Sequence, residues 1–404
     1  MDRKPFRRVA RPLTLMADTE ELIRHQKKDK KWLQRKTKPQ MHTNGSCIRS
    51  VELFAGAGGL SLGLNEYTRR IQASHKIEFA LEWDANVLKV LSDNLKPVST
   101  LATDVENIIN GKSLKSKRLT KKEQAFVEEY THAKKPDILM GGPPCQGNSN
   151  ANNHSRRTDS RNKLYLKMVR AAIVLNPRIV IIENVRDVVR SVGGEVQTAI
   201  EVFEQLGYKV SHEVLKASDF GVAQTRSRHF LIASKGRKPD FSILEQFKLS
   251  KARTLKWAIW DLRDKLTTEG EFNSTTKGKS KLNQERMQWL IDNDEYELCY
   301  DLKPDCHKRK NTHPAVYGRM HWDEPSSTLT AGFTSNGQGR YTHPDADPGR
   351  TITPHEAARI QSFPDWYKFP DNVKRGILTK GIGNAVPPLL AMYVCHVALS
   401  SLDE

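Results

Sequence analysis

The chain has 404 residues, a formal charge of +18 and a sequence pI near 9.6. No apolar run reaches the roughly eighteen residues that a membrane span needs, and the first residues, MDRKPFRRVARPL, lack the apolar centre of a secretory signal. The five cysteines are scattered and odd in number, unlike the dense even sets of small secreted domains. We therefore expect a soluble cytoplasmic protein whose positive charge attracts nucleic acid; a lysine-rich solvated surface is the alternative.

Residues 1–47 form a basic N-terminal extension with little apolar periodicity, apart from a short helix predicted within residues 18–34. Two interpretations of this extension stay open. It is either a flexible terminus or a segment that contacts phosphates without reading sequence.

From residue 48 onward, apolar runs of strand length alternate with amphipathic stretches of helical length. Such alternation predicts an α/β fold, with a mostly parallel, doubly wound sheet that is covered by helices on both faces. Ligands bind at the carboxyl ends of the strands in sheets of this kind. The expected strands and helices occupy residues 50–54 and 60–68, 77–82 and 85–94, 137–140 and 163–175, and 179–183 and 195–206; runs 209–216 and 230–233 follow, and a charged helical insertion precedes the fourth strand at residues 114–135.

The first strand ends in VELFAGAGGLSLGL, which places Phe54, Gly56 and Gly58 at a strand-to-helix turn. Missing side chains at this turn allow a ligand to approach the backbone and the helix N-terminus. A purely structural tight turn has the same pattern. No G-x-x-x-x-G-K-[ST] sequence is present, which argues against a P-loop nucleotide triphosphatase.

The next two strand ends carry acidic and aromatic residues. Glu82, in LEWDAN, lies where an acidic side chain bonds the hydroxyls of a ribose, and Trp83 offers a flat face to an adenine. Asp104, in LATDVEN, is placed to accept a bond from an adenine amino group. Each residue alone also fits a helix cap or a core tryptophan, but their order along successive strand ends indicates a nucleoside ligand.

The stretch GGPPCQGNSN places Cys145 directly after two prolines and between glycines, next to the fourth strand. The prolines restrict the backbone there and hold the thiol at the sheet edge. A lone cysteine is usually a buried structural residue. However, the fifth strand, RIVIIENV, ends with Glu183 at the same edge, where desolvation raises the pKa of a carboxyl group. A thiolate beside a proton donor is a catalytic pair.

Seven blocks in this order resemble the DNA (cytosine-5) methyltransferase family: VELFAGAGGL, EWDANV, GGPPCQGNSN, IIENVRDV, QTRSRHF, RTITPHEAARIQSFPDW and GIGNAVPPLLA. The resemblance covers about residues 50–399. It implies a Rossmann-like methyltransferase fold with a smaller target recognition domain. The implied divisions are a catalytic domain over residues 48–234, a target recognition domain over 235–347 and a return of the catalytic domain over 348–404.

The resemblance also implies a reaction. Cys145 attacks carbon 6 of a cytosine flipped out of the duplex, because a stacked base hides this carbon. Glu183 bonds or protonates ring nitrogen 3 and the exocyclic amine, and carbon 5 takes a methyl group from S-adenosylmethionine. Arg228 holds the base oxygen with its permanently charged guanidinium, while Arg226 and Gln224 orient the loop. Pairing with phosphate or carboxylate is the structural alternative for the two arginines.

The family pattern assigns further contacts. The implied cofactor contacts are Phe54, Gly56, Gly58, Glu82, Trp83, Asp104 and Asn384. The implied DNA contacts are Gln146, Ser149, Arg156, Arg157, Arg161, Thr328, Thr330 and Arg340. The pattern usually has an aromatic residue where this chain has Asn148, which puts the packing and closure of the cysteine loop in doubt. No metal site is expected, because Cys299, Cys306, His307 and His313 lack a close Cys-x-x-Cys pair.

We therefore predict a DNA cytosine-5 methyltransferase of a bacterial restriction-modification system that uses S-adenosylmethionine. It is expected to act as a monomer on double-stranded DNA in the nucleoid, separately from a cognate restriction endonuclease. An RNA methyltransferase of similar architecture and a catalytically silent DNA-binding relative are the alternatives. The joint presence of Cys145, Glu183 and Arg228 argues against the silent relative.

Overall fold

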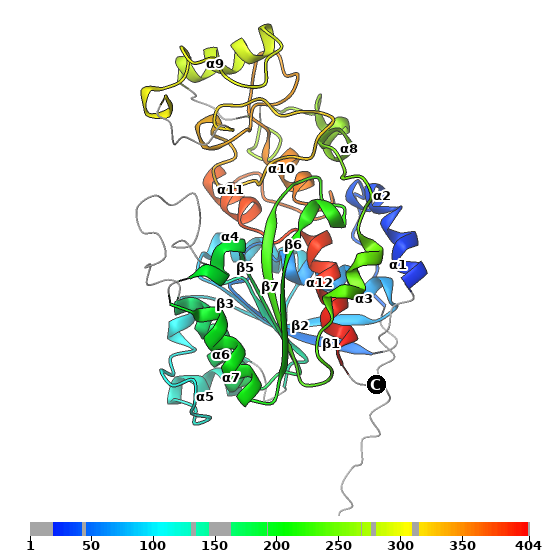
Figure 1. Cartoon of the computed structure of the whole chain (residues 1–404), viewed down its shortest axis with the longest axis vertical. Coiled ribbons are helices and arrows are strands. Elements are labelled where there is room, and N and C mark those ends of the chain that lie inside the picture. The colour runs from blue at the N-terminus through cyan, green and yellow to red at the C-terminus, as the bar shows by residue number, and fades with distance from the viewer. Residues whose placement is uncertain are drawn as a thin grey trace, which may run out of the picture.

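A seven-stranded sheet forms the centre of the computed structural model, with the strand order β3-β2-β1-β4-β5-β7-β6 (Figure 1). The structure describes residues 19–42, 46–130, 135–144, 163–191, 193–267, 269–275, 280–308 and 315–402. The strands are β1 (Cys47–Leu53), β2 (Ser74–Glu82), β3 (Ser99–Ala102), β4 (Ile138–Gly141), β5 (Ile179–Val185), β6 (Lys209–Lys216) and β7 (Ser227–Ser234).

Strands β1 to β5 pair in parallel, whereas β7 is inserted between β5 and β6 and runs antiparallel to both. The sheet is therefore mostly parallel, as predicted. The antiparallel β7 was not predicted, because the run at residues 230–233 carries no sign of strand direction. The short connection from β6 to β7 explains it, since a parallel crossover needs a dozen or more residues.

Helices cover both faces of the sheet. Along β5, Ile179 and Ile181 face one apolar cluster while Val180 and Ile182 face another. Helices α3 (Gly59–Arg70) and α12 (Pro388–Ser400) belong to the first cluster, and α6 (Leu164–Leu175) and α7 (Glu195–Gln205) to the second. A strand with two buried faces reads as a continuous apolar run, which is why β5 was recognisable from the sequence.

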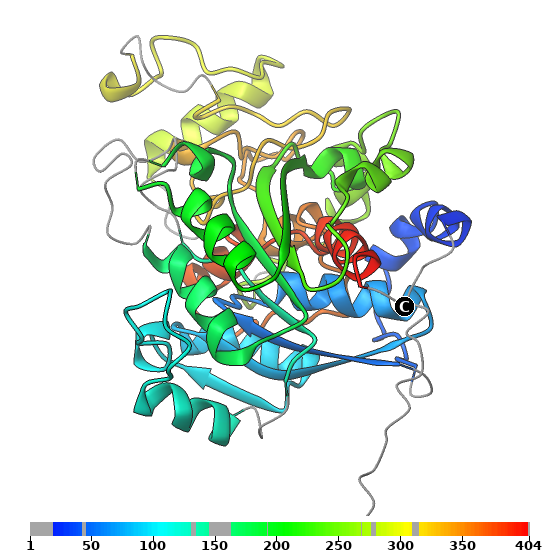
Figure 2. The same cartoon turned by 60° about the horizontal axis from the view of Figure 1, so that its bottom comes forward.

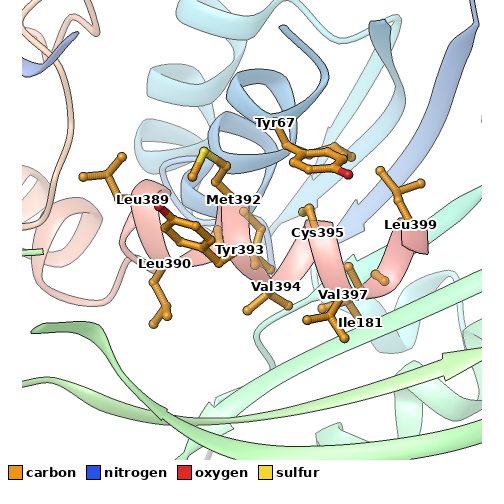
Figure 3. Packing of buried hydrophobic residues seen from close by; sticks show 14 of the residues in the cluster. Tyr67, Ile181, Leu389, Leu390, Met392, Tyr393, Val394, Cys395, Val397 and Leu399 are labelled. Atoms are coloured by element: carbon orange, nitrogen blue, oxygen red, sulfur yellow. The ribbon is translucent and has the colours of Figure 1, made fainter. Parts of the chain in front are cut away.

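Helix α12 is apolar on all sides and lies in the core beside α3. Figure 3 shows Cys395 beside Tyr67 of α3 and Val397 beside Ile181 of β5. Gly63 of α3 allows the two helices to approach closely, since a Cβ atom at this position would lie only 2.4 Å from the Cβ of Ala391. The stretch 375–400 is apolar enough to cross a membrane by composition, but 94% of its most apolar window is buried inside the protein. It therefore behaves as a core helix.

The remaining helices complete the described structure. Near the sheet are α4 (Ala85–Leu95), η1 (Val105–Asn107), α5 (Lys121–Tyr130), η4 (Arg186–Arg190) and η5 (Ala217–Phe220). The stretch 235–347 contains η6 (Phe241–Phe247), α8 (Leu255–Ile259), η7 (Trp260–Leu262), α9 (Lys281–Asp292), η8 (Asp305–His307) and η9 (Asn336–Gln338), and no strand among its described residues. Helices α10 (Pro354–Ile360) and α11 (Arg375–Gly383) lead back to α12.

The stretch 235–347 divides its packing between two places. Leu290, Leu298 and Tyr317 form a small cluster of their own near α9, which lies at the far end of the molecule from the sheet (Figure 1). Leu244 and Phe247 of η6, in contrast, pack into the main core with α12. The domain boundaries near residues 235 and 347 remain predictions.

The described part of the N-terminal extension is folded. Helices α1 (Thr19–Gln26) and α2 (Asp29–Leu33) occupy the region of the predicted short helix. Leu22 and Leu33 are buried in the main core, and the Asp29 carboxylate is fully buried. Asp29 pairs with Arg70 of α3 at 2.9 Å and with Arg253 at 2.9 Å. Residues 19–42 therefore fasten α3 to the chain before α8, while residues 1–18 lie outside the described structure.

We predict that Asp29→Ala destabilises the protein by about 3 kcal/mol, because it leaves two arginines beside an emptied buried site. Urea unfolding monitored by tryptophan fluorescence measures this loss. Lys30→Ala is the matched control, since Lys30 is the exposed neighbour in the same helix. Equal unfolding midpoints for the two variants would contradict the clamp role of Asp29.

Candidate active site

The glycine turn after β1 forms the first part of the site. Phe54, Gly56 and Gly58 have φ angles of +55°, +53° and +78°, so all three adopt the left-handed conformation. A Cβ atom at Gly58 would lie 2.9 Å from the hydroxyl of Tyr367, whereas one at Gly56 would meet nothing within 4 Å. The turn is therefore packed on one side and open at Gly56, which leaves room for a ligand beside the backbone.

The end of β2 lies directly against this turn. The Glu82 carboxylate accepts hydrogen bonds from the backbone N–H groups of Gly56 at 3.0 Å and Asp84 at 3.3 Å. Burial raises the pKa of Glu82, and these hydrogen bonds oppose the rise. The Trp83 side chain beside it is 70% exposed, and the Lys380 ammonium lies 5.7 Å from the ring centre. An indole this exposed has a free apolar face at the sheet edge.

Asp104 and Asn384 come to the same edge from other elements. Asp104 is exposed after β3, which pairs with β2, and its carboxylate caps η1 by accepting the N–H of Glu106 at 2.8 Å. Asn384 is exposed at the C-terminal cap of α11. The chain after α11 closes onto the glycine turn, since a Cβ atom at Gly59 would lie 2.1 Å from the backbone oxygen of Val386. The C-terminal segment therefore returns to the turn that follows the first strand.

Glu52 was not recognised from the sequence. It is almost completely buried in β1, and the hydroxyl of Ser61 donates to its carboxyl group. Burial raises the pKa of Glu52 to about 8, and the negative charge of Glu82 adds to the rise. Glu52 is therefore largely neutral at pH 7. Its signal in the sequence is a single acid within the apolar run VELF, at a position that a strand with two buried faces hides from water.

The second part of the site lies at the ends of β4 and β5. A Cβ atom at Gly142 would come within 2.9 Å of a Glu183 carboxylate oxygen, so the backbone after β4 passes directly beside this side chain. The Asn184 amide donates to the backbone oxygen of Pro143 at 3.1 Å. The start of the cysteine loop is thus fixed to the end of β5. This contact gives Asn184, the neighbour of Glu183 in the sequence, a positioning role.

Arg228 of β7 pairs with Glu183 because antiparallel pairing places the two residues on one face, two positions apart in register. The Arg228 Nε atom lies 3.0 Å from Glu183 Oε1, and the two side chains are only 14% and 10% exposed. Burial raises the pKa of Glu183, while Arg228 and Arg226 oppose this rise. The pair thus places a carboxyl group and a guanidinium side by side at the end of β5.

Arg226 and Gln224 connect this site to the C-terminal half of the chain. The Arg226 guanidinium donates to the backbone oxygens of Leu329 at 3.0 Å and Gly383 at 3.1 Å, and its Nε atom has no hydrogen-bond partner among the described residues. The buried Gln224 amide donates to Gln361 and accepts the N–H of Leu329, each at 2.9 Å. Both residues therefore hold neighbouring segments in place.

The predicted DNA contacts divide into two groups. Thr328 and Thr330 lie on the segment held by Arg226 and Gln224, and Tyr341 bonds the Thr328 backbone oxygen and the Thr330 hydroxyl. Arg340 donates to the backbone oxygens of Tyr296 and Arg319 and pairs with Glu297, so it braces the region around α9. The remaining site residues lie outside the described structure: Cys145, Gln146, Ser149, Arg156, Arg157 and Arg161, together with Asn148.

Within the described ranges, no group of three His, Cys, Asp or Glu side chains has an arrangement that could hold a metal ion. Of the four residues weighed for zinc, His313 and the Cys306 side chain fall outside those ranges.

Comparison with known proteins gives a consistent relationship. Residues 48–399 match the model of the C-5 cytosine-specific DNA methylase family. The chain is 37% identical over 381 residues to Type II methyltransferase M1.BsuMI of Bacillus subtilis (strain 168), which covers 94% of this chain and 87% of the relative. It is 30% identical to Type II methyltransferase M1.HphI of Haemophilus parahaemolyticus over 86% of each chain.

Solved structures support the same fold. The S. pombe Dnmt2 methyltransferase superposes with a TM-score of 0.60 at 18% identity, over 88% of this chain and 99% of that one. Together with the glycine turn, the buried Glu183–Arg228 pair and the family match over residues 48–399, these relationships establish that the chain belongs to the C-5 cytosine-specific DNA methylase family.

Proposed function

We propose that this methyltransferase modifies carbon 5 of a cytosine within a specific double-stranded DNA sequence, with Cys145 as the nucleophile and S-adenosylmethionine as the methyl donor. The observation that carries this proposal is the buried Glu183–Arg228 pair directly beside Gly142, three residues before Cys145. A carboxyl group and a guanidinium at this point suit the acceptor and donor atoms on one edge of a cytosine ring.

The residues at the ends of β1, β2 and β3 fit the proposed cofactor. The open backbone at Gly56 suits close approach of the donor, the Glu82 carboxylate suits ribose hydroxyls, and the exposed Trp83 ring suits an adenine face. Asp104 and Asn384 complete the proposed contacts. When bound here, S-adenosylmethionine supplies the methyl group.

The proposed chemistry begins at Cys145. Its thiolate bonds to carbon 6 of the flipped-out cytosine, and Glu183 donates a proton to ring nitrogen 3 as the ring gains electron density. Addition moves the electron pair of the carbon 5–carbon 6 double bond to carbons 4 and 5, so carbon 5 becomes the nucleophile that would take the methyl group, while the electron pair of the broken sulfur–methyl bond would remain on the donor sulfur. Loss of the carbon 5 proton to water then restores the double bond, expels the Cys145 thiolate and returns the nitrogen 3 proton to Glu183.

The two arginines have distinct proposed roles in this reaction. Arg228 holds the cytosine oxygen and exchanges part of its pairing with Glu183 for the base. Arg226 keeps the segments around Leu329 and Gly383 at the site and leaves its free Nε for the substrate. Contacts to the DNA are assigned to Gln146, Ser149, Arg156, Arg157, Arg161, Thr328, Thr330 and Arg340, with Arg340 acting through the brace around α9.

The two relatives described above are named Type II methyltransferases, and this supports a role in a restriction-modification system. We propose that the enzyme works as a monomer on DNA in the bacterial cytoplasm and protects it from a separate restriction endonuclease.

A covalent trap tests the nucleophile. In the presence of S-adenosylmethionine, duplex DNA that contains 5-fluorocytosine should form a complex with the wild-type enzyme that survives denaturing electrophoresis, because fluorine on carbon 5 cannot leave as a proton after methyl transfer. Cys145→Ala should abolish this complex, whereas Cys47→Ala, at the exposed thiol that begins β1, should retain it.

The sequence of this duplex is chosen beforehand. Bisulfite sequencing of a plasmid from expressing cells identifies the sequence that is methylated. Methylation of transfer RNA with no modification of the plasmid would instead identify an RNA methyltransferase. Absence of any trapped complex on the identified sequence would sink the proposed mechanism.

Glu183→Gln tests the proton donor. We predict a fall in kcat on the order of a hundredfold, because the amide keeps the shape of the side chain but cannot donate a proton reversibly. Burial raises the pKa of Glu183, so its protonated form persists to a higher pH than in a free glutamate. Wild-type activity should therefore fall as pH rises through this pKa, and the variant should lose that limb of the pH profile. Unchanged S-adenosylmethionine affinity is the control for folding, and an unchanged kcat contradicts the role.

Trp83→Ala tests the cofactor face. The affinity for S-adenosylmethionine should fall about tenfold, since stacking of a base on an aromatic ring contributes roughly 1–3 kcal/mol. Isothermal titration calorimetry measures this change without any methylation. Trp260→Ala is the matched control, because Trp260 is also exposed but lies on η7. Equal affinities for the two variants would remove Trp83 from the cofactor site.

A further inference from the structure

A strongly basic loop lies between η1 and α5, over residues 111–122. It has no acidic residue, and all of its basic side chains are exposed: Lys112, Lys115, Lys117, Arg118, Lys121 and Lys122. This loop, called here the basic loop, belongs neither to the glycine turn after β1 nor to the site around Glu183.

A buried arginine holds the backbone of the basic loop in place. Arg170 of α6 is 2% exposed and donates to the backbone oxygens of Ser113 at 3.1 Å, Ser116 at 2.6 Å and Arg118 at 2.8 Å. The same guanidinium pairs with both carboxylate oxygens of the buried Glu123, at 2.9 and 2.6 Å. Burying a charged pair is costly unless its hydrogen bonds are satisfied, so this arrangement stabilises one particular loop conformation.

Both ends of the basic loop are fixed as well. The Gly111 N–H donates to Glu123 at 2.9 Å, and a Cβ atom at Gly111 would lie 2.2 Å from Arg170 Nε, so only glycine leaves room for the guanidinium. Leu114 and Leu119 pack against the apolar cluster that contains α6 and α7. The basic side chains thus project from a fixed backbone, unlike those of a solvated charge run in a flexible segment.

Lysines from two other segments come to the same surface. Lys135 precedes β4, and Lys235 follows β7. The Lys235 N–H donates to the backbone oxygen of Arg178 at 3.0 Å, and the Arg178 N–H donates to the backbone oxygen of Asp137 at 3.0 Å, so the segments that carry Lys135 and Lys235 lie side by side. Burial lowers the pKa of Lys235, and the charges of Lys135 and Lys117 lower it further. Bringing like charges together destabilises the folded protein unless an anion offsets them.

We propose that the basic loop, with Lys135 and Lys235, binds the phosphate backbone of double-stranded DNA outside the catalytic edge of the sheet. The loop contains no aromatic side chain to stack on a base, and its two leucines face the core, which favours backbone contact over base reading or an apolar protein interface. Glu128 and Glu129, exposed on α5, limit the surface on one side.

The position of this surface implies a separate contact with DNA. Figures 1 and 2 both place α5, which follows the basic loop, at the end of the molecule opposite α9. A short duplex at the active site does not extend to the basic loop, whereas a long or looped DNA can also contact it. The surface would therefore hold the enzyme on DNA through contacts that do not depend on sequence. This inference relies on the proposed function only for duplex DNA as the substrate.

The test compares short and long DNA. The variant Lys115→Gln/Lys117→Gln/Arg118→Gln keeps every backbone acceptor of Arg170. Its methylation of a short duplex of about two helical turns that carries the identified sequence should match the wild type. On a linear plasmid with the same sequence, we expect KM to rise on the order of tenfold at low salt. The salt dependence of binding should weaken by ~0.9 in log–log slope for each lost phosphate contact.

The matched control is Lys76→Gln/Lys89→Gln/Lys96→Gln, which removes the same charge from exposed positions on β2, on α4 and directly after α4. It should leave KM on the plasmid within twofold of the wild type. Equal effects of the two variants would reduce the result to net charge and overturn the proposal. An unchanged KM on the plasmid, an equal loss on the short duplex, or a loss of binding to RNA alone would overturn it too. Absence of wild-type methylation on any duplex would instead count against the proposed function.

Discussion

The active site depends on one constraint, the burial of Glu183 beside the antiparallel strand β7. Because β7 runs opposite to β5, Arg228 enters the sheet at the end where Glu183 leaves it. A parallel strand in this place would present its C-terminal end, and the arginine would lie at the opposite edge. The guanidinium stabilises a carboxyl group that burial disfavours, and Gly142 leaves just enough space for the cysteine loop to pass them. The Glu183–Arg228 pair therefore depends on the antiparallel strand in a mostly parallel sheet.

The glycine turn after β1 also depends on segments that are distant in the sequence. Glu82 holds the turn through the Gly56 N–H, and the chain after α11 closes over Gly59. Helix α12 then fills the core beside α3, so the last part of the sequence completes the face that the first strand begins. Arg226 and Gln224 join this return to the segment at Leu329. The same packed segments therefore support both parts of the site.

The sequence predicted the parts of this arrangement that depend on local pattern. Buried runs such as β5, the turn at Gly56 and the acid at Glu183 each have a signature within a few residues. The direction of β7, the Arg228–Glu183 pair and the Pro143–Asn184 contact depend on how distant segments pack, and no local pattern records that packing. Glu52 was missed for a related reason: an acid in a strand looks exposed until both faces of the sheet are known to be covered. The helices at residues 19–33 appeared only as one weak helix, because their stability comes from Asp29 and the core.

Charge in this protein serves two physically different purposes. Arginines 70, 170 and 226 are buried and Arg228 is largely covered, and each is fixed by a carboxylate or by backbone oxygens, so they set geometry. The lysines of the basic loop are exposed and meet no carboxylate of their own loop, so they act on whatever anion approaches. Arg170 connects the two purposes. Its buried guanidinium pairs with Glu123 and also holds the backbone from which the exposed charges extend. Part of the net charge of +18 is therefore held at defined positions by a buried ion pair, an arrangement that suits the regularly spaced phosphates of a duplex.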